Sequence, residues 1–298
     1  MKWLIKNPAP LDDRQQKWGD FHFGRSLSAA LRRLGHEVET DYHPQWQNGQ
    51  QSDVVLVLRG KYAFERKGPN RDALHIMWNI SHPSAVTIAE YQAYDKVFIA
   101  SEQRARELEQ HLPGRVHPLL QCTDTEQFHV GADSGESTRR DIVFVGNTRS
   151  ERRDLVIEAA RAGIPVKIWG RGWRDQGLAD RLVAEYIENE ALGDLYRGAR
   201  ICLNDHWPDM VQAGFINNRI FDALACGLPV ISDRHPAITR LLGDGAVVQT
   251  SGDQARQVLA RVLVRYPSCL EAAHAVAETV RKEHSFDARV RELEYHVT

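Results

Sequence analysis

The sequence is poor in cysteine and contains no pattern typical of metal ligands. Its 298 residues include no C-x-x-C pair and only four cysteines: Cys122, Cys202, Cys226 and Cys269. Such spacing is typical neither of a zinc site nor of a disulfide-rich secreted domain. We therefore expect reduced thiols, no metal site and a cytoplasmic protein.

An excess of positive charge and long apolar runs are also missing. Lys and Arg number 38 against 40 Asp and Glu, which gives a net charge of −2, and such a balance does not favour nucleic acid as a partner. No stretch approaches the roughly 18 apolar residues of a membrane span. The first apolar run breaks at Lys6 and Pro8, too early for a signal peptide. Short basic clusters such as Arg152-Arg153 leave a peripheral membrane contact open.

Two glycine-rich nucleotide-binding motifs are absent. Neither G-x-x-x-x-G-K-[ST] nor G-x-G-x-x-G occurs in the sequence. The sequence therefore lacks the main evidence that would assign it to the P-loop NTPases or to the nicotinamide-dinucleotide enzymes.

Short, continuous apolar runs alternate with helical patterns along the chain. Such runs, bracketed by helices, indicate parallel strands that are covered on both faces. The runs are 3–6, 53–58, 73–78, 96–100, 141–146, 165–169, 200–204, 229–232 and 246–249. After the first run, apolar residues at 23, 27, 30, 31 and 34 predict a helix that ends at Gly35.

The stretch 129–140 separates the two series of strands. In HVGADSGESTRR, small and polar residues displace the large apolar side chains, as is typical of a linker. We predict an α/β protein with two doubly wound Rossmann-like domains, at 1–130 and 140–283, which face each other across a cleft. A helix over 284–298 could pack back on the first domain.

An anion-binding turn is predicted directly after the strand at 141–146. It contains Gly146, Asn147, Arg149, Arg152 and Arg153. Glycine lets an anion approach the backbone, the helix N-terminus adds partial positive charge, and arginine offers forked donors to phosphate oxygens. The alternative is a surface helix whose arginines pair with Glu151 and Asp154.

Two further strand ends contain residues suited to a ligand. In IWGRGW, the turn at Gly170 can hold a nucleobase, with Trp169 or Trp173 alongside, unless both rings belong to the core. In CLNDHW, Asn204, Asp205 and His206 could line a sugar pocket, and the alternative there is a capped turn.

The segment NNRIFDALACGLPVIS predicts a helix with a polar side. If 215–226 is helical, Asn218, Arg219 and Asp222 lie on adjoining faces. The acid can then accept hydrogen bonds from a sugar diol, whereas the alternative is an ion pair between Arg219 and Asp222. Gly227 is expected to end the helix before a buried strand.

The segment RIFDALACGLPVISDRHPAITRLLGDGAVV resembles the R-x-F-E-A-x-A-C-G-x-P-V-I region of retaining glycosyltransferases with the GT-B architecture. More narrowly, 141–250 resembles the spore-maturation-protein-like branch, whose C-terminal domain is of the "glycosyl transferases group 1" type. The resemblance is specific over this range and weak over 1–130.

The resemblance implies transfer of a sugar from a nucleotide diphosphate-sugar to a hydroxyl acceptor, with retention, without a metal and without a further cofactor. The acceptor would be a glycan, a glycolipid or a small metabolite. Asp222 then corresponds to the acid that holds the donor ribose, and Arg149, Arg152 and Arg153 to the diphosphate binders. A second acid of the larger family falls on Gly214, which is a departure from its pattern.

Two loops of the first domain supply the remaining candidates. In IMWNISHPS, Asn79, Ser81 and His82 follow a strand, and the family often has a polar residue or a His in such a loop, facing the donor sugar. His82 is thus the one catalytic candidate, to orient a hydroxyl or accept its proton, with a structural role as the alternative. A long loop is expected after the first strand, where Asp20 and His22 are acceptor-side candidates.

Two other functions remain open. A nucleotide-sugar 2-epimerase also uses two such domains, with acids and a His placed for chemistry at C2. The second is a non-catalytic protein that binds a nucleotide-sugar. The single feature that favours it is Gly214, which stands in place of the second acid.

Overall fold

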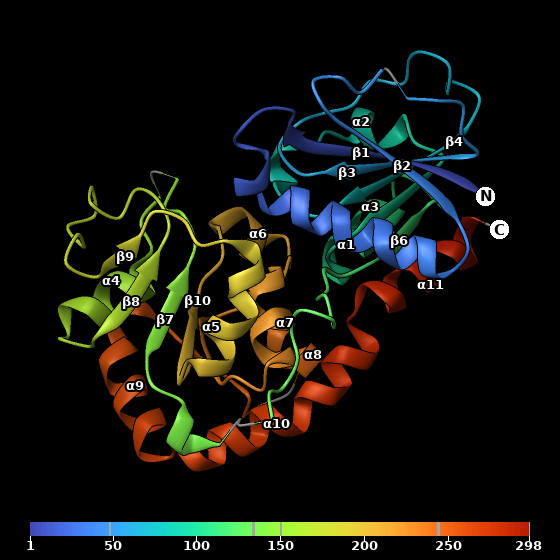
Figure 1. The fold of residues 1–298 in the computed structure, drawn as a ribbon. Coiled ribbons are helices and arrows are strands. Elements are labelled where there is room, and N and C mark those ends of the chain that lie inside the picture. The colour runs from blue at the N-terminus through green and yellow to red at the C-terminus, as the bar shows by residue number, and fades with distance from the viewer. Residues whose placement is uncertain (48, 133–134, 150, 243–244, 298) are drawn as a thin grey trace. The chain divides into compact units, whose positions relative to one another are not determined.

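The computed structural model describes residues 1–47, 49–132, 135–149, 151–242 and 245–297. The chain divides into two units (Figure 1). Unit 1 comprises Met1–Cys122, Trp207–Ile216 and Ser285–Thr298, and unit 2 comprises Thr123–His206 and Asn217–His284. Residues 133 and 134 of the predicted linker lie outside the described residues.

The sheet of unit 1 has six parallel strands in the order β2-β1-β3-β4-β5-β6. They are β1 (Lys2–Pro10), β2 (Glu37–His43), β3 (Val54–Arg59), β4 (Leu74–Asn79), β5 (Lys96–Ile99) and β6 (Val116–Pro118). Every residue of β3 is buried, because helices cover both faces of this sheet. The strand order reverses between β1 and β3, and open α/β sheets bind ligands at such a switch point.

The helices of unit 1 form two layers with separate hydrophobic clusters. They are α1 (Gly19–Arg33), α2 (Ile88–Gln92), α3 (Glu102–Glu109), α6 (Pro208–Gln212) and α11 (Phe286–Val297), with the short 3-10 helices η1 (Gln15–Lys17) and η2 (Pro83–Ala85). On one face, Leu27 of α1 and Val290 of α11 share a cluster with Trp78. On the other face, Leu108 of α3 and Met210 of α6 pack with Val55 and its neighbours.

Helix α6 belongs to unit 1 although it lies between two elements of unit 2 in the chain. Asp209 accepts a hydrogen bond from Ser84 (2.8 Å), and the carbonyl of Ala213 accepts one from Ser101 (2.6 Å). Phe215 is fully buried in the second cluster of this unit. The sequence does not predict this excursion, since a five-residue helix has too few positions to show which core it joins.

Unit 2 has a second sheet of six parallel strands, in the order β12-β11-β10-β7-β8-β9. They are β7 (Ile142–Val145), β8 (Val166–Trp169), β9 (Leu182–Ala184), β10 (Ile201–Asn204), β11 (Val230–Asp233) and β12 (Val247–Thr250). Its order reverses between β7 and β10, which is the second switch point.

The helices of unit 2 cover both faces of its sheet. They are α4 (Asp154–Arg161), α5 (Leu192–Gly198), α7 (Asn218–Ala225), α8 (Pro236–Leu242), α9 (Ala255–Val264) and α10 (Tyr266–Glu283), with the 3-10 helices η3 (Glu136–Thr138), η4 (Asn189–Ala191) and η5 (Gly252–Gln254). Leu155 of α4 and Leu259 of α9 pack on Phe144 and Ile168 of the sheet.

Helix α7 is fixed at its C-terminal end. Buried Arg139 donates hydrogen bonds to the carbonyls of Tyr196 (3.1 Å), Ala199 (3.1 Å) and Cys226 (2.9 Å). A cation at this end complements the helix dipole. Gly227 has φ 62°, and a Cβ there would lie 2.4 Å from the ring of a neighbouring histidine, so glycine is required where the sequence predicts the helix to end.

Two boundaries differ from the expectation. Helix α7 covers 218–225 rather than 215–226, because the preceding residues belong to the excursion into unit 1. Strand β1 extends to Pro10 and α1 begins at Gly19, so the predicted long loop is short and Asp20 and His22 lie in the helix. No helix in the described part of the chain is long and apolar enough to cross a membrane.

Candidate functional site

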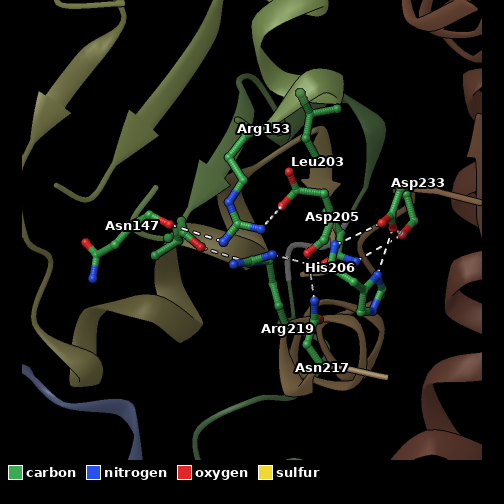
Figure 2. Close-up of polar contacts among 12 residues, drawn as sticks. Asn147, Arg153, Leu203, Asp205, His206, Asn217, Arg219 and Asp233 are labelled. Carbon is green, nitrogen blue, oxygen red and sulfur yellow. Dashed lines mark hydrogen bonds and ion pairs between the residues drawn. The ribbon is translucent and has the colours of Figure 1, made fainter. Parts of the chain in front are cut away.

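The main polar site of unit 2 lies at its switch point, where β7 and β10 end (Figure 2). Loops that follow the two strands diverge there, and backbone groups at their ends can reach a ligand. Gly146 and Asn147 follow β7, while Asn204 ends β10. Residues that the sequence predicts to bind a nucleotide diphosphate-sugar therefore come from different elements and meet at one edge of the sheet.

The turns after β7 and β8 are docked on each other. The amide of Gly146 donates to the carbonyl of Trp169 (2.8 Å), and the amide of Arg171 donates to the side chain of Asn147 (2.7 Å). Gly170 has φ 141°, and a Cβ there would lie 2.2 Å from the carbonyl oxygen of Gly146. Gly170 is thus required for the close approach of the two turns.

The two tryptophans of IWGRGW lie in different surroundings. Trp173 is 0% exposed, meets Phe144 edge-on at 5.3 Å and donates to the carbonyl of Gly146 (2.8 Å). Its ring is thus part of the core, as the alternative from the sequence holds. Trp169 ends β8 and is half-buried, so its ring is accessible beside the turn.

Arg149 and Arg152 flank Ser150, which lies outside the described residues. Arg149 is exposed and has φ 49°, a left-handed conformation that is strained for a residue other than glycine. Arg152 is exposed and pairs with Asp154 and with Glu158 (2.8 Å). The contacts of Arg152 match the alternative of a charged helix face, whereas Arg149 lies in the turn itself.

Arg153 connects the two sides of the switch point. It donates to the carboxylate of Asp205 (2.9 Å) and to the carbonyl of Asn147 (3.1 Å). The side chains of this ion pair are only 5% and 7% exposed. Burial lowers the pKa of Arg153 to about 10 and raises that of Asp205, but the arginine stays protonated at neutral pH. The pair therefore holds the turn after β7 against the end of β10.

Arg219 of α7 is a fixed cation at the same edge. It donates to the carbonyl of Val145 (2.8 Å) and to the side chain of Asn204 (2.7 Å). Its guanidinium carbon lies 4.6 Å from the centre of the Phe144 ring. A Cβ on Gly146 would lie 2.6 Å from its Nη2, so glycine leaves room for this side chain. The structure shows these contacts instead of the alternative ion pair within the helix.

A chain of hydrogen bonds extends from Asn204 to His206. Asn204 donates to Ser232 (3.0 Å), whose hydroxyl donates to Asp233 (2.9 Å). His206 Nδ1 lies 2.8 Å from Asp233, and its backbone amide donates to the same carboxylate (2.9 Å). Burial alone would raise the pKa of Asp233, but the bonds with His206 outweigh it and the pKa is lowered. Asp233 therefore stays ionised and fixes the orientation of the imidazole.

Asp222 is a buried carboxyl group rather than an open one. It is 6% exposed and accepts hydrogen bonds from Thr123 (2.7 Å) and from Asn218 (3.0 Å). Burial raises its pKa to about 8. Asn218 is exposed and covers one oxygen, so a ribose diol would have to replace its amide to reach the carboxyl.

In unit 1, Asp20, Ser81 and His82 come together at the ends of the strands. His82 Nδ1 lies 2.8 Å from Ser81 Oγ. A Cβ on Gly60 would lie 3.4 Å from an oxygen of Asp20 and 3.5 Å from Ser81 Oγ. His82 has φ 53°, which is again strained for a residue other than glycine. We call these four residues the Gly60 cluster.

Two other candidates of unit 1 have different surroundings. His22 Nε2 lies 2.7 Å from the carbonyl of Gln16, so its ring faces η1. Asn79 is buried, donates to the carbonyl of Ser81 (2.7 Å) and accepts from Tyr91 (2.7 Å). Asn79 thereby positions the loop that carries His82.

Gly214 lies in the segment that packs in unit 1. Its φ is 74°, and a Cβ there would lie 2.9 Å from Ser101 Oγ and 3.1 Å from Gln103. A side chain of any size would disturb this contact. Packing therefore explains why the acid expected from the family resemblance is absent here.

The second half of the chain matches a known family. Residues 149–295 match the family model described as glycosyl transferase-like. No curated protein sequence is significantly similar to the chain.

Solved structures match the whole chain. Sucrose-phosphate synthase from Thermosynechococcus elongatus has a TM-score of 0.71 at 13% identity, covering 99% of this chain and 98% of that one. The HepE protein of Anabaena in complex with UDP-glucose has a TM-score of 0.71 at 11% identity, covering 100% and 99%. The catalytic domain of starch synthase IV from Arabidopsis thaliana, bound to ADP and acarbose, has a TM-score of 0.65 at 11% identity, covering 99% of this chain and 98% of that domain. The fold of this protein is thus the α/β GT-B fold of glycosyltransferases.

Proposed function

We propose that the protein is a glycosyltransferase that moves a sugar from a nucleotide diphosphate-sugar to a hydroxyl group of an acceptor. The observation that carries the proposal is the fixed arginine site at the switch point of unit 2. Arg219 lies there within the range that matches a glycosyl transferase-like family. The GT-B fold of the chain supports the same activity.

The donor would use the C-terminal edge of β7, β8 and β10. Arg219 and Arg149 would pair with the diphosphate, because guanidinium groups match phosphate oxygens with two parallel donors. The turn at Trp169 would contact the base, Asp222 and Asn218 the ribose, and the chain from Asn204 to His206 the transferred sugar. Arg153 would act by holding the turn rather than by touching the donor.

Transfer breaks the bond between the sugar C1 and the diphosphate oxygen and forms one between C1 and the acceptor oxygen. The leaving diphosphate gains negative charge, which the already oriented guanidinium of Arg219 would stabilise. We propose that the acceptor oxygen attacks C1 from the face that the diphosphate leaves, so that the configuration at C1 is retained, and that this diphosphate takes the proton of the acceptor hydroxyl. Arginine supplies the positive charge in this scheme, so it requires no metal ion. His82 would orient the acceptor hydroxyl.

The alternatives from the sequence receive less support. The hint of a non-catalytic protein was Gly214, and packing in unit 1 accounts for that residue. Among the described residues of the site, no contact favours chemistry at C2 of the sugar over transfer.

The test is nucleotide binding followed by turnover. HepE was solved with UDP-glucose and starch synthase IV with ADP, so UDP, ADP, UDP-glucose and ADP-glucose are the first probes for calorimetry. Arg219→Ala should weaken the binding of one nucleotide by at least about tenfold. Arg152→Ala is the matched control, since Arg152 is exposed and paired with acids of α4.

Turnover then separates the candidate activities. Release of nucleoside diphosphate that depends on an added hydroxyl acceptor supports transfer. Release with an altered hexosamine and no acceptor would indicate the epimerase instead. Equal binding losses in both arginine variants, or no nucleotide binding by the wild type, would contradict the proposal.

A further inference from the structure

A row of aromatic rings lies at the switch point of unit 1. Tyr62 follows β3 and stacks on His43, at the end of β2, with ring centres 4.1 Å apart and planes within 10°. Trp18, just before α1, has its ring centre 6.3 Å from that of Tyr62, and the two ring planes are within 22° of each other. All three side chains are half-buried. They present partly exposed ring surfaces at the edge where an α/β sheet binds its ligand.

Polar groups adjoin this row. Tyr62 is two residues from Gly60, and Trp18 is two residues from Asp20, so the aromatic row continues directly into the Gly60 cluster. The carboxylate of Asp20 and the hydroxyl of Ser81 both lie beside Gly60. The ring of His82 forms a hydrogen bond with that hydroxyl. Half-buried aromatic side chains and hydroxyl-binding groups are thus neighbours at the same edge of the sheet.

The ammonium group of Lys61 lies over the same rings. Its Nζ is 5.2 Å from the centre of Tyr62 and 5.9 Å from that of Trp18. Lys61 is exposed, and a long flexible side chain can leave a ring face at little cost. Because one ammonium group lies near both ring centres, Trp18 and Tyr62 are close enough together for one ligand to contact both.

The combination fits a sugar ring. A pyranose has C–H groups on its faces, which pack on aromatic rings, and hydroxyls around its edge, which carboxylate, hydroxyl and imidazole groups bind. A lipid chain would need a lining of aliphatic side chains, which this row of rings and polar groups does not provide. The residues therefore favour a carbohydrate over an aliphatic ligand.

We infer that unit 1 binds a saccharide acceptor, with one sugar ring against Trp18 and Tyr62 and one hydroxyl held by Asp20 and His82. That this saccharide is the acceptor rests on the proposed function, which this inference narrows to a carbohydrate acceptor. The binding of a saccharide itself does not depend on the transfer reaction and can be tested without a donor.

The experiment is saturation-transfer NMR on the full chain with methyl glycosides of glucose, galactose, mannose, N-acetylglucosamine, rhamnose and xylose, with and without UDP. Octanol and adenosine serve as lipid-like and base-like probes. At least one glycoside should bind, and Trp18→Ala should weaken it by about tenfold. Trp18→Phe, which keeps a ring, should restore most of the affinity.

Asp20→Asn keeps the shape of the side chain and provides a second variant in case Trp18→Ala unfolds. It should weaken the same glycoside and lower the melting temperature only slightly, because Asp20 lies in the first turn of α1, where its negative charge stabilises the helix. Tyr295→Ala is the matched control, because Tyr295 is an aromatic residue of the same unit, 82% exposed on α11. Its removal should leave glycoside binding unchanged.

The outcomes separate the two proposals. Binding of a glycoside that depends on Trp18 supports the inference even if the protein binds no UDP or ADP, in which case only the proposed donor site fails. Nucleotide binding without any glycoside binding overturns the inference and leaves the donor site standing. Preferential binding of octanol or adenosine at Trp18, or equal losses in Trp18→Ala and Tyr295→Ala, also overturns it.

Discussion

Replacement of Asp222 by asparagine tests the central electrostatic feature of unit 2. The carboxyl is 6% exposed and accepts hydrogen bonds from Thr123 and Asn218. Asparagine has nearly the same shape and keeps one oxygen acceptor, while the amide of Asn218 can turn its oxygen towards the new NH₂ group. The variant therefore removes the titration of residue 222 and preserves its packing.

The expected effect on stability follows from the raised pKa. Burial moves the pKa of Asp222 from 3.8 to about 8. At a pH between these two values, residue 222 has lost its proton in the unfolded chain but keeps it in the folded chain. The free energy of unfolding therefore falls as pH rises, by about 1.4 kcal/mol per pH unit. Between pH 5 and pH 7.5 the wild type should lose about 3 kcal/mol relative to Asp222→Asn. The loss should end above the folded pKa.

Urea unfolding of the full chain, followed by circular dichroism at several pH values from 5 to 7.5, measures both stabilities. Other titrating groups are common to the two proteins and cancel in the difference. A difference that stays constant over this range would show that the carboxyl is already ionised in the folded protein. The burial argument would then be refuted.

Two further variants test the packing of each unit. Gly214→Ala should lower the free energy of unfolding by on the order of 2 kcal/mol, because φ is 74° and the new Cβ would lie 2.9 Å from Ser101 Oγ. Gly114→Ala, with φ 72° but open space around it, should cost about 1 kcal/mol less, and equal losses in urea unfolding would contradict the contact argument. Arg139→Met should cost about 3 kcal/mol, because three buried carbonyls lose their donor. Exposed Arg140→Met should cost almost nothing in the same assay, and similar midpoints for the two variants would argue against this role.

The strands were the most predictable part of the fold. Each continuous apolar run of the sequence contains a strand, because a strand buried on both faces needs apolar residues at every position. Strands β2, β6 and β9 were not predicted. In β2, EVETDYH, polar residues interrupt any apolar run, and the three residues of β6 and of β9 are too few to form a pattern. The short helix α6 was likewise beyond prediction, because its assignment to unit 1 depends on contacts with distant residues such as Ser84 and Ser101.

The candidate site was predictable as a set of residues but not as a network. Asn204, His206 and Arg219 follow from polar positions at strand ends and on one helix face. Their partners depend on the strand order, which no local pattern determines. Ser232 and Asp233 were missed, although PVISD shows the available signal: two polar residues at the end of a buried strand.

Backbone conformation gives an independent reason to regard two predicted residues as functional. Among the described residues other than glycine, His82 and Arg149 have positive φ, at 53° and 49°. Such conformations cost free energy and persist where the surrounding structure imposes them. His82 also precedes Pro83, and a residue before proline normally prefers extended backbone. Both residues follow strands at the ligand-binding edges of their sheets, so strain and side-chain chemistry, which are separate observations, indicate the same two loops.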